Sequence, residues 1–94
     1  MHVFSVELTF YIPSAASLKD KRQIRRSIVE KAKKRFNISI SEVDTQDVHQ
    51  TLTLGIAVVS ADFTHGQNSL EEIIRFMEKN SEAELIYISR ADVG

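Results

Sequence analysis

The 94-residue chain contains no cysteine and no tryptophan, a single proline, and only three glycines. Without cysteine, it can form neither a disulfide nor a thiolate metal site. No run of apolar residues approaches the roughly 20 that span a bilayer. The first residues alternate between polar and apolar, unlike the basic and apolar blocks of a signal peptide. We therefore expect one domain over residues 1–94, in the cytoplasm and without contact to a membrane.

Motifs of common catalytic chemistry are also missing. The chain has no nucleophile elbow, no phosphate-cradling glycine loop and no HExxH motif. The three histidines, His2, His49 and His65, do not stand at metal-ligand spacing, so we expect no metal and no cofactor. Asp47 and His49 near Lys19 would permit a general-base cluster. Because such polarity is ordinary in a turn, a non-enzymatic protein is favoured, while an active site shared between subunits stays open.

Positive charge is scarce outside one segment. Nine of the twelve basic residues fall between Lys19 and Arg35, where only Asp20 and Glu30 oppose them. This segment carries +7 and the rest of the chain −8, within a net charge of −1. A separation of this kind attracts anionic partners in a way that the net charge does not reveal.

Alternation of apolar and polar residues predicts four strands, over residues 4–12, 38–43, 50–60 and 85–89. Pro13 ends the first strand, because proline supplies no hydrogen-bond donor to the sheet. Gly55 stands in the middle of the third strand, on the face opposite the apolar residues. A bulge or a close backbone approach is expected at this glycine.

Two segments have the 3.6-residue period of amphipathic helices. Ser17, with Asp20 three residues later, predicts the N-cap of a helix that ends near Phe36, with Asn37 as a left-handed stop. A second helix begins near Thr64, which has capping-box spacing, and ends at Asn80. Its apolar stripe consists of Leu70, Ile73, Ile74 and Met77.

Asp62 and His65 stand at the start of this second helix. A carboxylate just before a helix commonly accepts a hydrogen bond from a free backbone amide of the first turn. We therefore interpret the pair as a capping arrangement rather than as an acid/base pair.

The order βαββαβ predicts an α+β, ferredoxin-like sandwich, with a four-stranded antiparallel sheet and both helices on one face. In this topology the first turn of the first helix lies beside the loop at residues 44–50. The open face of the sheet would present Val3, Ser5, Glu7, Thr9, Tyr11, Thr51, Thr53, Ala57, Val59, Leu85 and Tyr87. This face is unusually apolar and the second strand is an edge, so a homodimer through either, or a small-ligand-sensing face, is one expectation.

The basic helix is the strongest candidate for a binding surface. Its residues Lys19, Arg22, Arg26 and Lys33 fall within about 60° on one flank, a stripe that can follow phosphates. The candidate anion or nucleic-acid site comprises Lys19, Lys21, Arg22, Arg26 and Lys33, with the adjoining loop residues Asp47, His49 and Gln50. The alternative is a solvated helix face, since lysine and arginine are good helix formers.

The open sheet face is a poor RNA platform by comparison. The βαββαβ order is shared with the RNA recognition motif, which needs aromatic residues on its two central strands. The third strand has none, and only Tyr11 serves on the first. We therefore expect any RNA to meet the helix. Arg25, close to the apolar stripe, is expected to extend its guanidinium past the helix start.

Several segments together resemble the YlxP-like family of small bacterial proteins. They are Pro13, Ser17-Leu18-Lys19-Asp20-Lys21-Arg22, Arg35-Phe36-Asn37-Ile38-Ser39-Ile40, Glu42, Asp47, Gln50, Thr53-Leu54-Gly55, Val58-Val59-Ser60, Asp62 and His65. This resemblance implies a ferredoxin-like fold in a family of unknown function. Its genes often lie near those for translation initiation factor 2 and ribosome-binding factor A, which implies ribosomal RNA or a ribosome-assembly protein as partner. Position 49 is often tryptophan and position 25 commonly apolar in such sequences, whereas this chain has His49 and Arg25.

Overall fold

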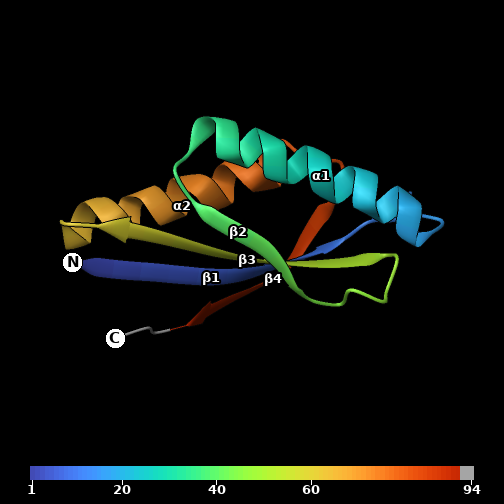
Figure 1. Cartoon of the computed structure of the whole chain (residues 1–94), viewed down its shortest axis with the longest axis horizontal. Helices are drawn as coiled ribbons and strands as arrows, with labels where there is room; N and C mark the ends of the chain where they lie inside the picture. The colour runs from blue at the N-terminus through green and yellow to red at the C-terminus, as the bar shows by residue number, and fades with distance from the viewer. Residues whose placement is uncertain (92–94) are drawn as a thin grey trace.

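The computed structural model describes residues 1–91 and has the predicted order of elements. They are β1 (His2–Tyr11), α1 (Leu18–Arg35), β2 (Ser39–Asp44), β3 (Thr51–Ser60), α2 (Phe63–Lys79) and β4 (Glu84–Ala91). The strands form one antiparallel sheet in the order β2-β3-β1-β4. Both helices cover the same face of this sheet (Figure 1). The predicted ferredoxin-like sandwich is confirmed, with β2 and β4 as its edges.

The core lies between the sheet and the two helices. Every second residue of β1 and β3 faces it, and Leu8, Phe10, Leu52 and Leu54 have no exposed surface. The helices close the core with Ile24, Ile28, Ala32, Leu70, Ile73, Ile74 and Met77. Burial of this apolar surface, worth about 25 cal/mol per Å², holds α1 in one orientation. This orientation determines which side of α1 faces solvent.

The start of α1 is capped as predicted. Ser17 Oγ accepts a hydrogen bond from the amide of Asp20, and Asp20 Oδ2 accepts one from the amide of Ala16. These reciprocal bonds satisfy backbone donors that the helix leaves free.

The predicted left-handed stop at Asn37 is wrong. The helix ends at Arg35, and Phe36 is its C-cap, in extended conformation with φ of −129°. Among the non-glycine residues that the structure describes, positive φ occurs at Thr45. The extended backbone turns Phe36 toward α2, where its ring packs against that of Phe76 at 5.4 Å between centroids.

The start of α2 agrees with the capping interpretation. Asp62 is the N-cap, and its Oδ2 accepts a hydrogen bond from the amide of His65 at 2.7 Å. The capping box predicted at Thr64 is wrong, because the helix already begins at Phe63. The Asp62 carboxylate accepts the hydrogen bond of the His65 amide, so the helix starts directly after Asp62.

A β-bulge in β4 changes which side chains face the core. Leu85 pairs with Phe10 and Tyr87 with Thr9, which leaves Ile86 as the extra residue. Leu85 therefore packs against the core, and its predicted place on the open face is wrong. A bulge shifts the alternation by one residue, which the strand pattern alone does not show.

One ion pair ties β4 to α2. The guanidinium of Arg90 donates a hydrogen bond to the carboxylate of Glu71. This bond, together with the positive charges of Arg90 and Arg75, lowers the pKa of the Glu71 carboxyl, against the opposing effect of burial.

Gly66 sets how closely α2 approaches β1 and β3. A Cβ at this buried position would lie 2.2 Å from Phe4 Cε2 and 2.8 Å from Ser60 Cβ. We predict that Gly66→Ala destabilises the protein by about 1–3 kcal/mol, although alanine favours a helix over glycine by about 1 kcal/mol. Urea unfolding measures the difference. The control Gln67→Ala, at an exposed neighbour, should stay within about 0.5 kcal/mol, and a more stable Gly66→Ala protein would contradict the close approach.

Candidate functional site

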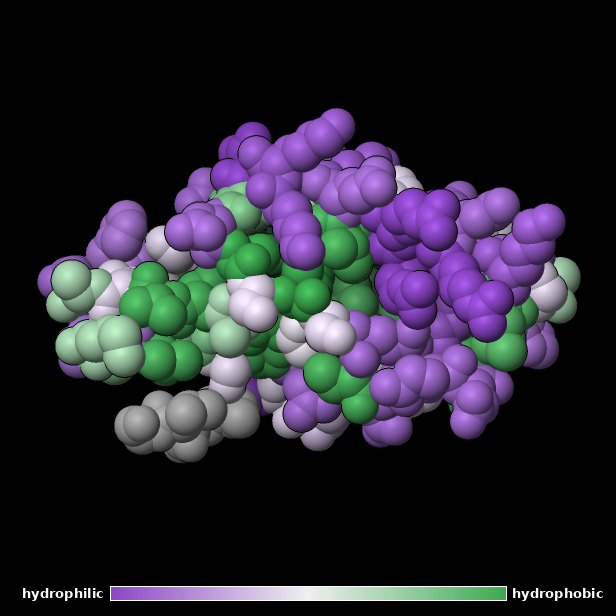
Figure 2. Space-filling view, viewed as in Figure 1, coloured by the Kyte–Doolittle hydropathy of each residue, from purple (hydrophilic) through white to green (hydrophobic). Residues whose placement is uncertain are grey.

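Four cations lie exposed along one side of α1, and we call Lys19, Arg22, Arg26 and Lys33 the basic flank. Within residues 1–91, none of the four forms an ion pair with a carboxylate. Figure 2 shows hydrophilic side chains gathered over the part of the surface where Figure 1 places α1 and its first turn. The charge of the flank is therefore available to a partner from outside the molecule.

Lys21 does not belong to this surface, so its prediction as an anion contact is wrong. Its side chain is buried, with 1% of the residue exposed. The ammonium lies 2.7 Å from Glu42 Oε2 and donates hydrogen bonds to the carbonyl oxygens of Val48, at 2.7 Å, and Thr45. The buried ammonium thus has two hydrogen-bond acceptors and one ion-pair partner, which offsets part of the cost of its burial.

The position of Lys21 follows from the helical period. Ile24 and Ile28 are buried three and seven residues later, so Lys21 extends the apolar stripe by one turn toward the helix start. That spacing is the signal in the sequence that would have placed this lysine inside.

Glu42 is the functional residue that the strand pattern did not single out. It pairs with Leu54 in the sheet and so faces the helices, and its side chain is 6% exposed. Its Oε1 accepts a hydrogen bond from Arg25 Nη1 at 2.7 Å. Arg25 therefore turns toward Glu42, and the expectation that it extends past the helix start is wrong.

The Lys21–Glu42–Arg25 network is one carboxylate between two cations. A carboxylate at an inward position of a predicted strand must be paired with a cation if it is buried. The position of Glu42 in the strand pattern was therefore the signal in the sequence that predicts such a partner. The network consumes the two basic residues of α1 that lean toward the core. The flank, together with Lys31, Lys34 and Arg35, carries the positive charge of α1 that faces outward.

The same network positions the loop between β2 and β3. Lys21 holds the carbonyls of Thr45 and Val48 against the first turn of α1, and the amide of Ile12 donates to the Gln50 carbonyl at 2.9 Å. Figure 1 shows this loop and the first turn of α1 at the same end of the molecule. The predicted neighbourhood is observed. The loop residues Asp47, His49 and Gln50 are all exposed there.

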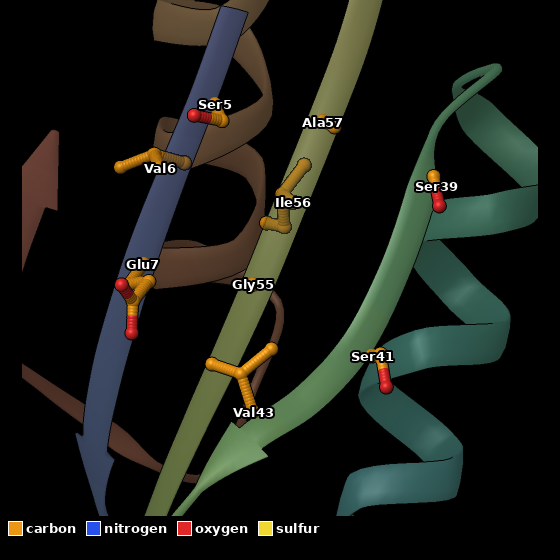
Figure 3. Close-up of a pocket in the computed structure, with 9 residues that line it drawn as sticks. All are labelled: Ser5, Val6, Glu7, Ser39, Ser41, Val43, Gly55, Ile56 and Ala57. Carbon is orange, nitrogen blue, oxygen red and sulfur yellow. The ribbon is translucent and has the colours of Figure 1, made fainter. Parts of the chain in front are cut away.

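The open face of the sheet carries a shallow hollow of about 500 Å³ (Figure 3). Glu7 and Ser5 on β1 lie on one side and the serines of β2 on the other. At one end the Val43 side chain lies across β3 at Gly55. A Cβ added at Gly55 would stand only 2.7 Å from Val43 Cγ1. The close approach predicted at Gly55 is observed, but it is made by the Val43 side chain and not by a backbone segment. A carboxylate among hydroxyls repels phosphate, so this hollow does not extend the basic site.

Aromatic residues are few on this open face. Of the described strands, β3 contributes no aromatic side chain to it, and β1 contributes Tyr11 at the edge of the register. Tyr87 stands on the outer strand β4. The pair of central-strand aromatics on which an RNA recognition motif stacks bases is not present.

Residues 1–91 contain neither a metal-ligand cluster nor a membrane-spanning helix. No group of three His, Asp or Glu side chains in this range could hold a metal ion. His49 and His65 lie beyond opposite ends of β3. Neither helix in the range has the length and apolar character that crossing a membrane requires.

Comparisons with known proteins agree on a family and a fold. Residues 3–90 match the family described as a protein of unknown function, DUF503. The uncharacterized protein YlxP of Bacillus subtilis (strain 168) is 36% identical over 73 residues, which cover 78% of this chain and 79% of that protein. A de novo designed protein with a ferredoxin fold, solved by NMR in solution, matches 100% of this chain and 89% of its own, with a TM-score of 0.55 and 20% identity. At that identity the likeness concerns the fold alone.

We predict that Lys21→Met destabilises the protein by about 3–5 kcal/mol, since it removes one partner of a buried ion pair. It also leaves the Thr45 and Val48 carbonyls without their donor, so the loop amides should exchange hydrogen faster. Urea unfolding and hydrogen exchange measure the two effects. Lys19→Met, at an exposed position two residues away, is the matched control and should change stability by no more than about 0.5 kcal/mol. Equal effects of the two substitutions would mean that the network does not hold the loop.

Proposed function

The chain belongs to the YlxP-like DUF503 family of proteins of unknown function, and we propose that it is a non-enzymatic accessory factor that binds RNA through the basic flank of α1. One observation carries the proposal. Lys19, Arg22, Arg26 and Lys33 lie exposed on one side of a helix without a carboxylate partner among the described residues. Neutralising phosphates releases their counterions, which is the main source of affinity for such a surface.

The distribution of charge supports the helix side as the contact. Outside residues 19–35 the chain carries −8, and the open sheet face presents Glu7 in its hollow. A polyanion is repelled by that face and attracted to α1, so it approaches in one orientation. Ribosomal RNA is the RNA to test first, because the genes of this family often neighbour those of translation initiation and ribosome assembly factors.

The first test reverses the charge of the flank. We predict that Arg22→Glu, Arg26→Glu and Lys33→Glu together lower the affinity for ribosomal RNA at least about 100-fold at low salt, equivalent to about 2.8 kcal/mol. The slope of log affinity against log salt should fall by about one for each lost contact. Filter binding at several salt concentrations measures both.

The matched control reverses three exposed cations outside the basic flank, two on α1 and one on α2, as Lys31→Glu, Lys34→Glu and Arg75→Glu. It has the same net charge as the flank variant and should retain most of the affinity. If both variants lose the same affinity, the RNA responds to net charge and not to the flank. If the affinity for RNA does not depend on salt concentration and the flank instead retains an acidic protein, the partner is a protein.

A second candidate function is self-association, and the edge strand β4 favours it. Ile86, Tyr87 and Ile88 are 55%, 63% and 40% exposed on this edge. Edge strands that avoid pairing usually carry charges or bulges. Both edges carry an irregular register, at Ile86 in β4 and at Val43 in β2. The edges differ in composition, because β2 has serines at positions 39 and 41 where β4 exposes three successive apolar residues. The observation therefore favours β4 over β2 as the pairing edge of a homodimer.

We predict that, if this edge pairs, light scattering at micromolar concentration gives the mass of a dimer and Tyr87→Lys gives that of a monomer. A lysine on an exposed edge discourages strand pairing. Ser41→Lys, on the opposite edge, is the control and should leave the mass unchanged. A monomeric wild-type protein would remove this candidate and leave RNA binding untouched.

A further inference from the structure

The flank and the β2–β3 loop together point to a more specific partner, and we infer that this surface recognises double-stranded RNA. The inference rests on the proposed function and names the form of the RNA. In this arrangement the flank follows the phosphates of one strand. The loop residues Asp47, His49 and Gln50 contact ribose 2′-hydroxyl groups beside them.

The flank is suited to a regular backbone rather than to unpaired bases. Lys19 and Lys33 are fourteen residues apart, so the flank extends about 21 Å along a straight helix. Single-stranded nucleic acids are held by aromatic side chains on which bases stack. The flank contains none, and the exposed aromatics Tyr11, Phe63 and Tyr87 belong to β1, α2 and β4. A duplex needs no such stacking, because its bases are already paired.

The loop has a different chemistry from the flank. Asp47 repels phosphate, yet its carboxylate can accept a hydrogen bond from a hydroxyl group. Gln50 both donates and accepts, as a neutral His49 does. A 2′-hydroxyl can both donate and accept a hydrogen bond, and it is the group by which proteins distinguish RNA from DNA. The composition of the loop thus suits ribose, while that of the flank suits phosphate.

The geometry of the loop is set before any partner binds. Lys21 holds it at Thr45 and Val48, and the amide of Thr53 donates to Thr45 Oγ1 at 3.1 Å. The Gln50 carbonyl is held by β1 through Ile12. Binding therefore spends little free energy on ordering the loop. The loop is thereby held against the start of α1, the part of the helix that carries Lys19 and Arg22.

The shape of A-form RNA is compatible with this pair of contacts. Its minor groove is wide and shallow and displays the 2′-hydroxyls between two phosphate strands. An element on a phosphate strand with a short polar loop beside it reaches these hydroxyls without entering the deep major groove. Recognition of this kind depends on shape and on ribose, and little on base sequence.

The experiment compares three labelled probes by fluorescence anisotropy: an RNA duplex of about 16 base pairs, a DNA duplex of the same sequence, and one unpaired RNA strand. We expect the RNA duplex to bind at least about tenfold more tightly than either of the others. His49→Ala with Gln50→Ala should bring the affinity for the RNA duplex down to that for the DNA duplex. The salt slope should stay the same, because no phosphate contact is lost. Gln46→Ala, exposed in the same loop, is the control and should keep the preference.

The outcomes separate the two proposals. Salt-dependent binding of the single strand with the same affinity as the duplex would overturn the inference and leave the proposed function standing. A preference for RNA that survives the double substitution would show that the loop does not read ribose. If the wild-type protein binds none of the probes in a salt-dependent way, the proposed function itself fails. Circular dichroism of each variant verifies that it is folded.

Discussion

One buried ion network determines how the parts of this surface lie. Glu42 faces the helices from an edge strand and binds Lys21 and Arg25 of α1. Burial of a charge is costly unless its partners are well placed, and here the Lys21 ammonium has one carboxylate and two carbonyl oxygens as partners. The network therefore joins three elements, namely the start of α1, the end of β2 and the loop that follows it.

The network also divides the charge of α1 between structure and surface. Nine basic residues in this segment suggest a broad cationic helix, yet Lys21 and Arg25 serve the interior. Arg35 lies over the rings of Phe36 and Phe76, at 5.7 and 5.3 Å from their centroids. The cations of α1 that remain are the four of the flank with Lys31 and Lys34, fewer than the composition implies. A narrow flank next to a rigid neutral-to-acidic loop is a surface that can discriminate among polyanions rather than merely attract them.

Much of the fold could be predicted because it rests on local rules. Hydrophobic alternation and the helical period located all six elements, and their order limits the topology to a few choices. Capping by Ser17 and Asp62 depends on residues three positions away. Two of the errors lie where tertiary features are involved: Phe36 leaves the helix and packs against Phe76, and a bulge turns Leu85 to the core.

The sequence by itself determined the elements, their order, the glycine over which Val43 packs, and the concentration of positive charge on one helix. Only the tertiary structure decided which of those charges reach solvent. Lys19 and Lys21 are indistinguishable by composition, but Lys21 meets acceptors 21, 24 and 27 residues further along the chain. The reason is physical: local periodicity gives the direction of a side chain relative to its own helix, whereas its partners depend on how that helix docks on the sheet.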